Sequence, residues 1–289
     1  YKLRVLRQSK YEDFFRKYFE LTEELIEPED VYGIWNRFDT IVSGSDQIWN
    51  KHSNELDKVD WKYMMPYLLH GYDGYKISYA SSVVNMTDSE LEYIMKDVQT
   101  FDSISIRERS ACDFLNVKYN LNAKNVLDPT LLLSKEQWER YLPIKENNED
   151  YILYYALDSF KNIKKSLSII KKYGLTLNKK IKVIAPMTFV TSDRDIQFIY
   201  DAGPIDFLEL INNANFIITD SYHGTLFSIN FQKEFVSICR NNPSDGRKVD
   251  ILSKLGLADR IVSDVSEVFK FSQDNLINYD LVAEKKKRY

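Results

Sequence analysis

One histidine lies in a stretch whose residue types could support acid–base chemistry. Residues 218–228 read ITDSYHGTLFS, in which His223 follows a short apolar run and precedes an apolar-periodic segment. This order predicts a strand, a turn and a helix, with His223 at the turn. An imidazole titrates near neutral pH, and a general acid works best when its pKa is close to the working pH. His223 is therefore a candidate general acid; the alternative is a capping or core histidine.

The neighbours of His223 have simpler interpretations. We interpret Asp220 as a turn former, Ser221 as the N-cap of the following helix, and Gly224 as a residue that permits tight packing. The start of a helix also attracts anions, because its first N–H groups have no partners within the helix and its dipole is positive there. A phosphate or carboxylate ligand is the natural expectation for such a turn.

Two further polar groups are expected at the ends of buried strands. Ser43 to Gln47 (SGSDQ) follow the run FDTIV, and Arg107, Glu108 and Arg109 follow DSISI. In sheets of parallel strands, ligands bind at the carboxyl ends of the strands. The three groups could therefore belong to one ligand site, although a strand-end turn or a surface arginine is the simpler interpretation of each.

Short buried strands alternate with amphipathic helices along the chain, which predicts parallel sheets covered by helices on both faces. We expect an α/β protein of two Rossmann-like domains, residues 1–145 and 146–289, divided near the polar run KENNED. The predicted strands and helices are helix 9–26, strand 38–42 with a turn at 43–46, strand 75–84, helix 87–100, strand 102–106, a helix from 110, a strand from 124, strand 151–157, helix 161–173, strand 179–187, helix 204–214, strand 215–219, helix 225–231 and strand 235–239.

Composition excludes several classes of function. A net charge of -4 and a pI of about 5.6 argue against a nucleic-acid binder, which would carry a basic stripe. Two isolated cysteines and three scattered histidines offer neither a disulfide framework nor a metal site. We expect no transmembrane helix, no signal peptide and a cytoplasmic location. The basic end AEKKKRY is a solvated helix end or a weak contact with anionic lipid at the inner face of the membrane.

Several motifs together resemble those of the polysaccharide pyruvyl transferase family. The motifs are SGSDQIWN, KISYASSV, SIRERSACDFL, VLDPTLLL and GPIDFLELINNANFIITDSYHGTLFSINFQKEFVSI, in the order and approximate spacing of the family over residues 12–262. The resemblance implies two domains arranged as in GT-B glycosyltransferases, with a cleft between them. It implies transfer of the enolpyruvyl carbons of phosphoenolpyruvate (PEP) to two hydroxyls of one sugar, giving a cyclic pyruvate ketal in surface or capsular polysaccharide synthesis. PEP is then a co-substrate, and no cofactor or metal is required.

The resemblance also implies roles for particular residues. The family histidine corresponds to His223, and two family arginines correspond to Arg107 and Arg247, which we expect to bind the carboxylate and phosphate of PEP. His223 would be the acid for the leaving phosphate or for C3, and Asp46 is a candidate base for a sugar hydroxyl. The remaining predicted substrate-binding residues are Ser221, Gly224 and Thr225 at the helix start, and Ser45, Gln47 and Trp49 on the sugar side.

Residues 1–145 would then hold the sugar acceptor, either lipid-linked or nucleotide-linked, with Trp49 stacking on it or packing in the core. Residues 146–289, including a C-terminal helix, would hold PEP. The first β–α unit of the family does not precede residue 1, so it is either absent from this protein or missing from this sequence. Two rival functions stay open: a GT-B glycosyltransferase that uses a nucleotide sugar, and a non-catalytic relative that binds glycans.

Overall fold

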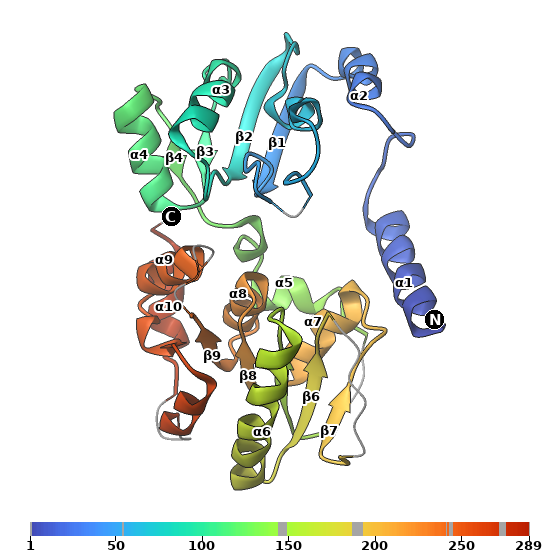
Figure 1. Ribbon diagram of the computed structural model, residues 1–289, viewed down its shortest axis with the longest axis vertical. Helices are drawn as coiled ribbons and strands as arrows, with labels where there is room; N and C mark the ends of the chain where they lie inside the picture. Colours follow the sequence, from blue (N-terminus) through green and yellow to red (C-terminus); the bar gives the residue numbers. More distant parts are fainter. Residues whose placement is uncertain are drawn as a thin grey trace. The chain divides into compact units, whose positions relative to one another are not determined.

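The structure forms two compact units, each built on its own parallel sheet (Figure 1). It is a computed structural model that describes residues 2–53, 55–143, 149–186, 193–240, 242, 245–271 and 276–288. The N-terminal unit is Thr22–Leu132, and the C-terminal unit is Leu133–Arg288 together with Tyr1–Leu21. The two-domain α/β fold expected from the sequence is confirmed.

The first helix belongs to the C-terminal unit, which differs from the predicted division into residues 1–145 and 146–289. Helix α1 (Lys2–Tyr18) lies next to α7 (Pro204–Asn213), and Lys10 Nζ is 2.9 Å from Asp206 Oδ2. This contact joins positions almost 200 residues apart, so local sequence patterns carried no sign of it. The predicted boundary between residues 145 and 146 lies outside the described residues.

The N-terminal unit contains a sheet of four parallel strands in the order β1-β2-β3-β4. Its helices are α2 (Pro28–Ile34), α3 (Asp88–Val98) and α4 (Arg109–Tyr119), and Thr87 is the N-cap of α3, with a capping box to Glu90. The strands are β1 (Thr40–Asp46), β2 (Tyr75–Ser81), β3 (Ser105–Ile106) and β4 (Lys124–Asn125).

The stretch SGSD is part of strand β1, not a turn after it. Ser43 pairs with Ser78, and Asp46 with Ser81, of the neighbouring strand β2. Gly44 has φ +152°, and a Cβ atom there would lie 2.1 Å from the carbonyl oxygen of Tyr79. The glycine that suggested a turn is therefore needed for close approach of two strands.

The C-terminal unit contains a sheet of six parallel strands in the order β10-β9-β8-β5-β6-β7. The central strands are buried on both faces, which explains their continuous apolar sequences such as YILYY and FIIT. The strands are β5 (Tyr151–Tyr155), β6 (Lys180–Ile184), β7 (Ile196–Phe198), β8 (Phe216–Thr219), β9 (Glu234–Ile238) and β10 (Ile261–Val262). Besides α1 and α7, the helices are α5 (Lys135–Glu139), α6 (Phe160–Leu177), α8 (Tyr222–Asn230), α9 (Gly246–Leu255) and α10 (Tyr279–Lys286).

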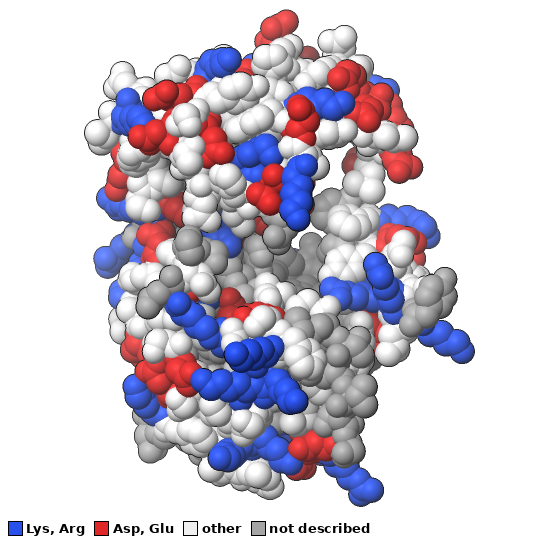
Figure 2. All heavy atoms as spheres, viewed as in Figure 1, with Lys and Arg blue, Asp and Glu red and all other residues white. Residues whose placement is uncertain are grey.

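The surface carries both signs of charge. On the face that Figure 2 shows, acidic and basic side chains are interspersed, and lysines gather over α6, whose sequence is FKNIKKSLSIIKKYGLTL. Within the described part of the chain, no helix is both long and apolar enough to cross a membrane.

Candidate active site

A polar pocket of about 340 Å³ lies at the carboxyl edge of the six-stranded sheet in the C-terminal unit. It is lined by Leu157, Asp220 and Arg240, which come shortly after the last residues of β5, β8 and β9. This is the edge at which parallel α/β sheets bind ligands. The lining residues are Leu157, Asp158, Ser159, Asp220, Ser221, Tyr222, Ile238, Arg240, Asn242, Asp245, Arg247 and Lys248.

Three helices begin at this pocket. Ser159 is the N-cap of α6, Ser221 the N-cap of α8, and Asp245 the N-cap of α9, and all three residues line the pocket. Each helix start contributes partial positive charge from its first N–H groups. Their convergence favours a small anionic ligand.

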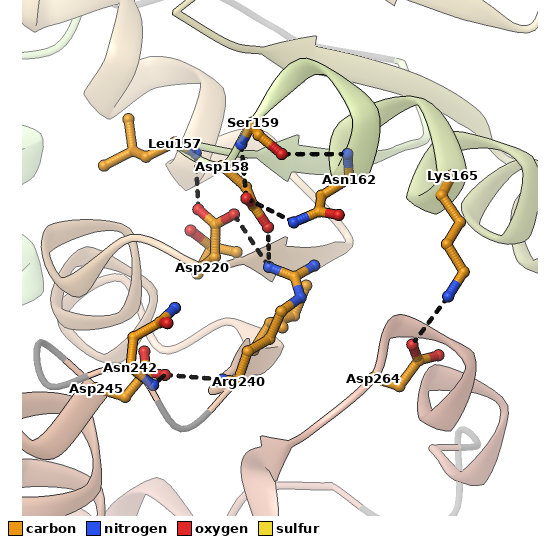
Figure 3. Close-up of polar contacts among 12 residues, drawn as sticks. Leu157, Asp158, Ser159, Asn162, Lys165, Asp220, Arg240, Asn242, Asp245 and Asp264 are labelled. Atoms are coloured by element: carbon orange, nitrogen blue, oxygen red, sulfur yellow. Dashed lines mark hydrogen bonds and ion pairs between the residues drawn. The ribbon is translucent and has the colours of Figure 1, made fainter.

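Arg240 joins two carboxyl groups across the pocket (Figure 3). Its Nη1 atom binds Oδ2 of Asp158 and lies 3.8 Å from Oδ2 of Asp220. The other oxygen of Asp220, Oδ1, accepts a hydrogen bond of 2.7 Å from the backbone N–H of Leu157. These contacts connect the loops that follow β5, β8 and β9.

Asp158 and Asp220 have pKa values shifted in opposite directions. Burial raises the pKa of Asp220 and outweighs the Leu157 hydrogen bond and the nearby positive charges. Burial also acts to raise the pKa of Asp158, but hydrogen bonds from Asn162 and Ser159 and the charge of Arg240 prevail, so its net shift is downward. One acid is thus biased toward the protonated form and its neighbour toward the ionised form.

Lys248 holds the pocket floor together. Its Nζ atom donates to the carbonyl oxygens of Asp220, at 2.8 Å, and Ile238, at 2.5 Å, and pairs with Asp245 Oδ1 at 2.8 Å. The Lys248 side chain is 4% exposed, so these contacts replace its hydration. Asp245 also accepts hydrogen bonds from the backbone N–H groups of Arg240 and Asn242.

His223 lies in the first turn of α8, not in a loop before it. Eight of the nine residues of α8 are buried, and His223 is the remaining, partly exposed one. Its ring contacts Tyr222 edge to face, with the ring centroids 5.3 Å apart. Tyr222 lines the pocket, whereas His223 is not among the described residues that line it.

Three predicted residues beside His223 have structural contacts. The Ser221 hydroxyl accepts a hydrogen bond from the N–H of Gly224, and the Ser221 carbonyl accepts one from the N–H of Thr225. The prediction that the Gly224 and Thr225 N–H groups bind phosphate is therefore wrong for this structure. A Cβ at Gly224 would lie 2.5 Å from Thr219 Oγ1, which confirms its expected role in tight packing.

Arg247 is the predicted arginine that reaches the pocket. It lies in the first turn of α9 and lines the pocket, and its guanidinium carbon is 5.0 Å from the centre of the Tyr222 ring. The negative face of an aromatic ring attracts a cation, so Tyr222 helps to hold the Arg247 guanidinium at the pocket. Arg247 is thus placed to contribute positive charge to a ligand in the pocket.

Arg107 is buried among acids in the N-terminal unit. Its guanidinium contacts Asp46 at 3.0 Å, Glu108 at 3.1 Å and Asp128 at 2.9 Å, and its side chain is 3% exposed. Its role as a PEP clamp is not supported by this structure, because three carboxylates already occupy the guanidinium. Instead, Arg107 orients the side chain of Asp46, which is 49% exposed. The backbone of Asp46 has φ 69°.

The other predicted sugar-side residues differ in their accessibility. Ser45 and Gln47 are partly buried at the end of β1, and Gln47 Oε1 accepts a hydrogen bond from Asn50. Trp49 is fully buried, donates to the Tyr67 carbonyl and packs edge to face on Phe101. Trp49 is therefore a core residue here and presents no ring face to a sugar, so the stacking alternative is wrong for this structure.

Sequence analysis missed the functional potential of Asp158, Asp220 and Arg240. Each follows a buried strand, which is the same signal that drew attention to His223 and Arg107. Their mutual contacts depend on strand order, which places β5 next to β8 and β8 next to β9. Among the described residues, no group of three or more His, Cys, Asp or Glu could hold a metal ion.

Comparisons with known proteins agree with this architecture. The family model described as "Polysaccharide pyruvyl transferase" matches residues 3–242. No curated protein matches the chain significantly. The Methanocaldococcus jannaschii UDP-GlcNAc 2-epimerase in complex with UDP-GlcNAc and UDP is 14% identical, with a TM-score of 0.56 over 95% of this chain and 86% of that chain. S. aureus MnaA with UDP is 10% identical, with a TM-score of 0.55 over 93% of this chain and 75% of that chain. These similarities show a shared GT-B fold.

Proposed function

The chain belongs to the polysaccharide pyruvyl transferase family, and we propose that it transfers the enolpyruvyl carbons of PEP to two hydroxyls of one sugar. The products are a cyclic pyruvate ketal and free phosphate, and the reaction serves surface polysaccharide synthesis in the cytoplasm of a bacterium. The observation that carries this proposal is the polar pocket, at which three helices begin and three cationic side chains meet.

The pocket has the chemistry that PEP needs. PEP carries a carboxylate and a phosphate on a three-carbon skeleton, so it requires several cations and N–H donors in a small volume. Arg240, Arg247 and Lys248 line the pocket, Arg240 and Lys248 being held by Asp158 and Asp245, and the volume of about 340 Å³ is at the small end of the range for ligand pockets. In this proposal Arg247 contacts PEP directly, Ser221 shapes the helix start, and Lys248 fixes the two strand ends.

His223 supplies a proton at the same helix start. In our proposal it is the general acid for the leaving phosphate or for C3 of PEP: it does not line the pocket itself, but it is partly exposed and its ring contacts the pocket residue Tyr222. The two N–H groups of Gly224 and Thr225 have no part in this proposal, since they are bonded to Ser221.

The acceptor side of the proposal rests on the N-terminal unit. Asp46 is the candidate base for a sugar hydroxyl, and Ser45 and Gln47 are neighbouring polar groups that could bind the sugar. Arg107 fixes the Asp46 carboxylate through the contact of 3.0 Å. The acceptor sugar, either lipid-linked or nucleotide-linked, is recognised in this proposal by hydrogen bonds and not by Trp49.

A nucleotide-sugar glycosyltransferase is the second candidate. The observation that favours it is the fold shared with proteins whose structures contain UDP or UDP-GlcNAc. A helix-start anion pocket could also hold a diphosphate. A non-catalytic glycan-binding relative would bind neither PEP nor UDP compounds at this pocket.

Thermal unfolding with PEP, UDP and UDP-sugars separates these functions. At 100 times its Kd, PEP should stabilise the wild type by about 2.7 kcal/mol. The effect should weaken in His223→Ala and persist in His52→Ala, which removes a histidine that contacts Glu90 in the N-terminal unit. Stabilisation by UDP compounds alone would favour the glycosyltransferase, and no response to either ligand would favour the non-catalytic relative.

A further inference from the structure

One carboxyl oxygen in the pocket lacks a hydrogen-bond partner among the described residues. Oδ2 of Asp220 is buried, and the side chain is 9% exposed. The nearest cation atom given by the structure, Nη1 of Arg240, is 3.8 Å away, beyond hydrogen-bond distance. An ionised carboxylate in this position would be poorly compensated, whereas a protonated one would gain a donor hydrogen.

The two other acids of the pocket are compensated. Asp158 binds Arg240 and accepts hydrogen bonds from Ser159 and Asn162. Asp245 pairs with Lys248 and accepts two backbone hydrogen bonds. Asp220 therefore differs from these neighbours, because within the described part of the chain one of its oxygens has a hydrogen-bond partner and the other has none.

We propose that Asp220 is held protonated when PEP is bound and is the acid that delivers a proton to C3 of PEP. This inference rests on the proposed function, and it leaves His223 to protonate the departing phosphate. Sequence analysis gave Asp220 only the role of a turn former. The carboxyl group keeps that role through Oδ1, while Oδ2 has no hydrogen-bond partner among the described residues.

The charges around Asp220 support a protonated state. The groups that face it are the cations Arg240 and Lys248 and the acid Asp158, and its pKa is already raised by burial. With Arg247 and Asp245 included, the pocket has three cations and three carboxyl groups, which cancel if all are ionised. A bound trianion adds negative charge and disfavours the Asp220 carboxylate further.

The proton balance of the reaction closes with two acids. Asp220 transfers its proton to C3 of PEP, and the C2–C3 π electrons form the new C–H bond, which leaves an oxocarbenium-like centre at C2. A sugar hydroxyl adds to C2 and releases its proton. The C2–O bond to phosphate then breaks, phosphate takes a proton from His223, and the second hydroxyl adds to C2 and releases its proton. The two released protons restore Asp220 and His223.

Asp220→Asn tests this assignment without removing the turn. The amide oxygen can still accept the Leu157 N–H, but the side chain cannot deliver a proton. Infrared difference spectra of PEP-saturated protein at neutral pH should show a protonated-carboxyl band in the wild type that is absent in Asp220→Asn. Exchange of the C3 hydrogens of PEP in D2O, followed by NMR, should slow at least about a hundredfold. Asp264→Asn, which removes a carboxyl group outside the pocket, should keep the band and the exchange.

The outcomes separate the two proposals. A wild type that PEP does not stabilise overturns the proposed function, and the role of Asp220 with it. A wild type that binds PEP but lacks the carboxyl band or the exchange overturns the role of Asp220 alone. A band or an exchange rate that is unchanged in a folded Asp220→Asn variant does the same.

Discussion

Asp158 and Asp220 contact the same arginine but respond oppositely to pH. The raised pKa of Asp220 means that the folded state holds its proton more tightly than the unfolded chain does. Its contribution to stability is full below the ordinary value of 3.8 and is lost as the pH rises through the folded value. The lowered pKa of Asp158 contributes stability above 3.8, and that contribution is lost as the pH falls through its folded value.

We therefore expect two asparagine substitutions to have opposite pH profiles. The free energy of unfolding of Asp220→Asn, relative to wild type, should increase as the pH rises above 3.8. That of Asp158→Asn should be lower than wild type above 3.8, and the deficit should shrink as the pH is lowered. Urea unfolding across a pH series that brackets this value measures both. Parallel profiles for the two variants would contradict the opposite shifts.

Residue types predicted which segments lie near the polar pocket better than they predicted the contacts of each side chain. Arg247 lines the pocket. His223 lies in α8, whose N-cap Ser221 lines it. The resemblance assigns Arg107 to an anion, and the sequence leaves Trp49 open between stacking on a sugar and packing in the core. Both side chains are buried in the structure. Burial depends on packing between distant segments, which residue type does not specify.

At the scale of elements, the sequence predicted most strands and helices of the described chain because their apolar periodicities are strong. It did not predict where β1 ends, since Gly44 reads as a turn signal but is required by the close approach of β2. It also assigned α1 to residues 1–145, whereas the ion pairs of Lys10 with Asp201 and Asp206 tie this helix to a distant part of the sequence. Strand order, which builds the pocket, likewise follows from tertiary packing.

Lys248 connects three elements and should be important for stability. It holds the ends of β8 and β9 through two carbonyl groups and the start of α9 through Asp245. Lys248→Met leaves the buried Asp245 without its cation, so we expect a loss of about 3–5 kcal/mol in the free energy of unfolding. Lys165→Met is the control, because Lys165 is 74% exposed and 3.9 Å from Asp264 (Figure 3), and should lose less than about 1 kcal/mol. Equal losses in urea unfolding would show that Lys248 does not connect these elements.

At the scale of the whole molecule, each unit has its own apolar core. The core of the N-terminal unit includes Trp49 and Ile106, and that of the C-terminal unit includes Ile152 and Val236. A ligand that binds one unit can therefore slow local opening there without acting on the other unit. The pocket assigned to PEP lies entirely within the C-terminal unit.

Hydrogen exchange should consequently locate PEP in one unit. With PEP alone, amides at the starts of α6, α8 and α9 should exchange more slowly, because the ligand stabilises the helix N-termini that border the pocket. Amides of residues 22–132 should be unchanged. Mass spectrometry of peptides from wild type and Arg247→Met, with and without PEP, measures the effect, and the variant should lose most of the protection. Protection confined to residues 22–132 would place PEP in the other unit and would reverse the proposed assignment of donor and acceptor.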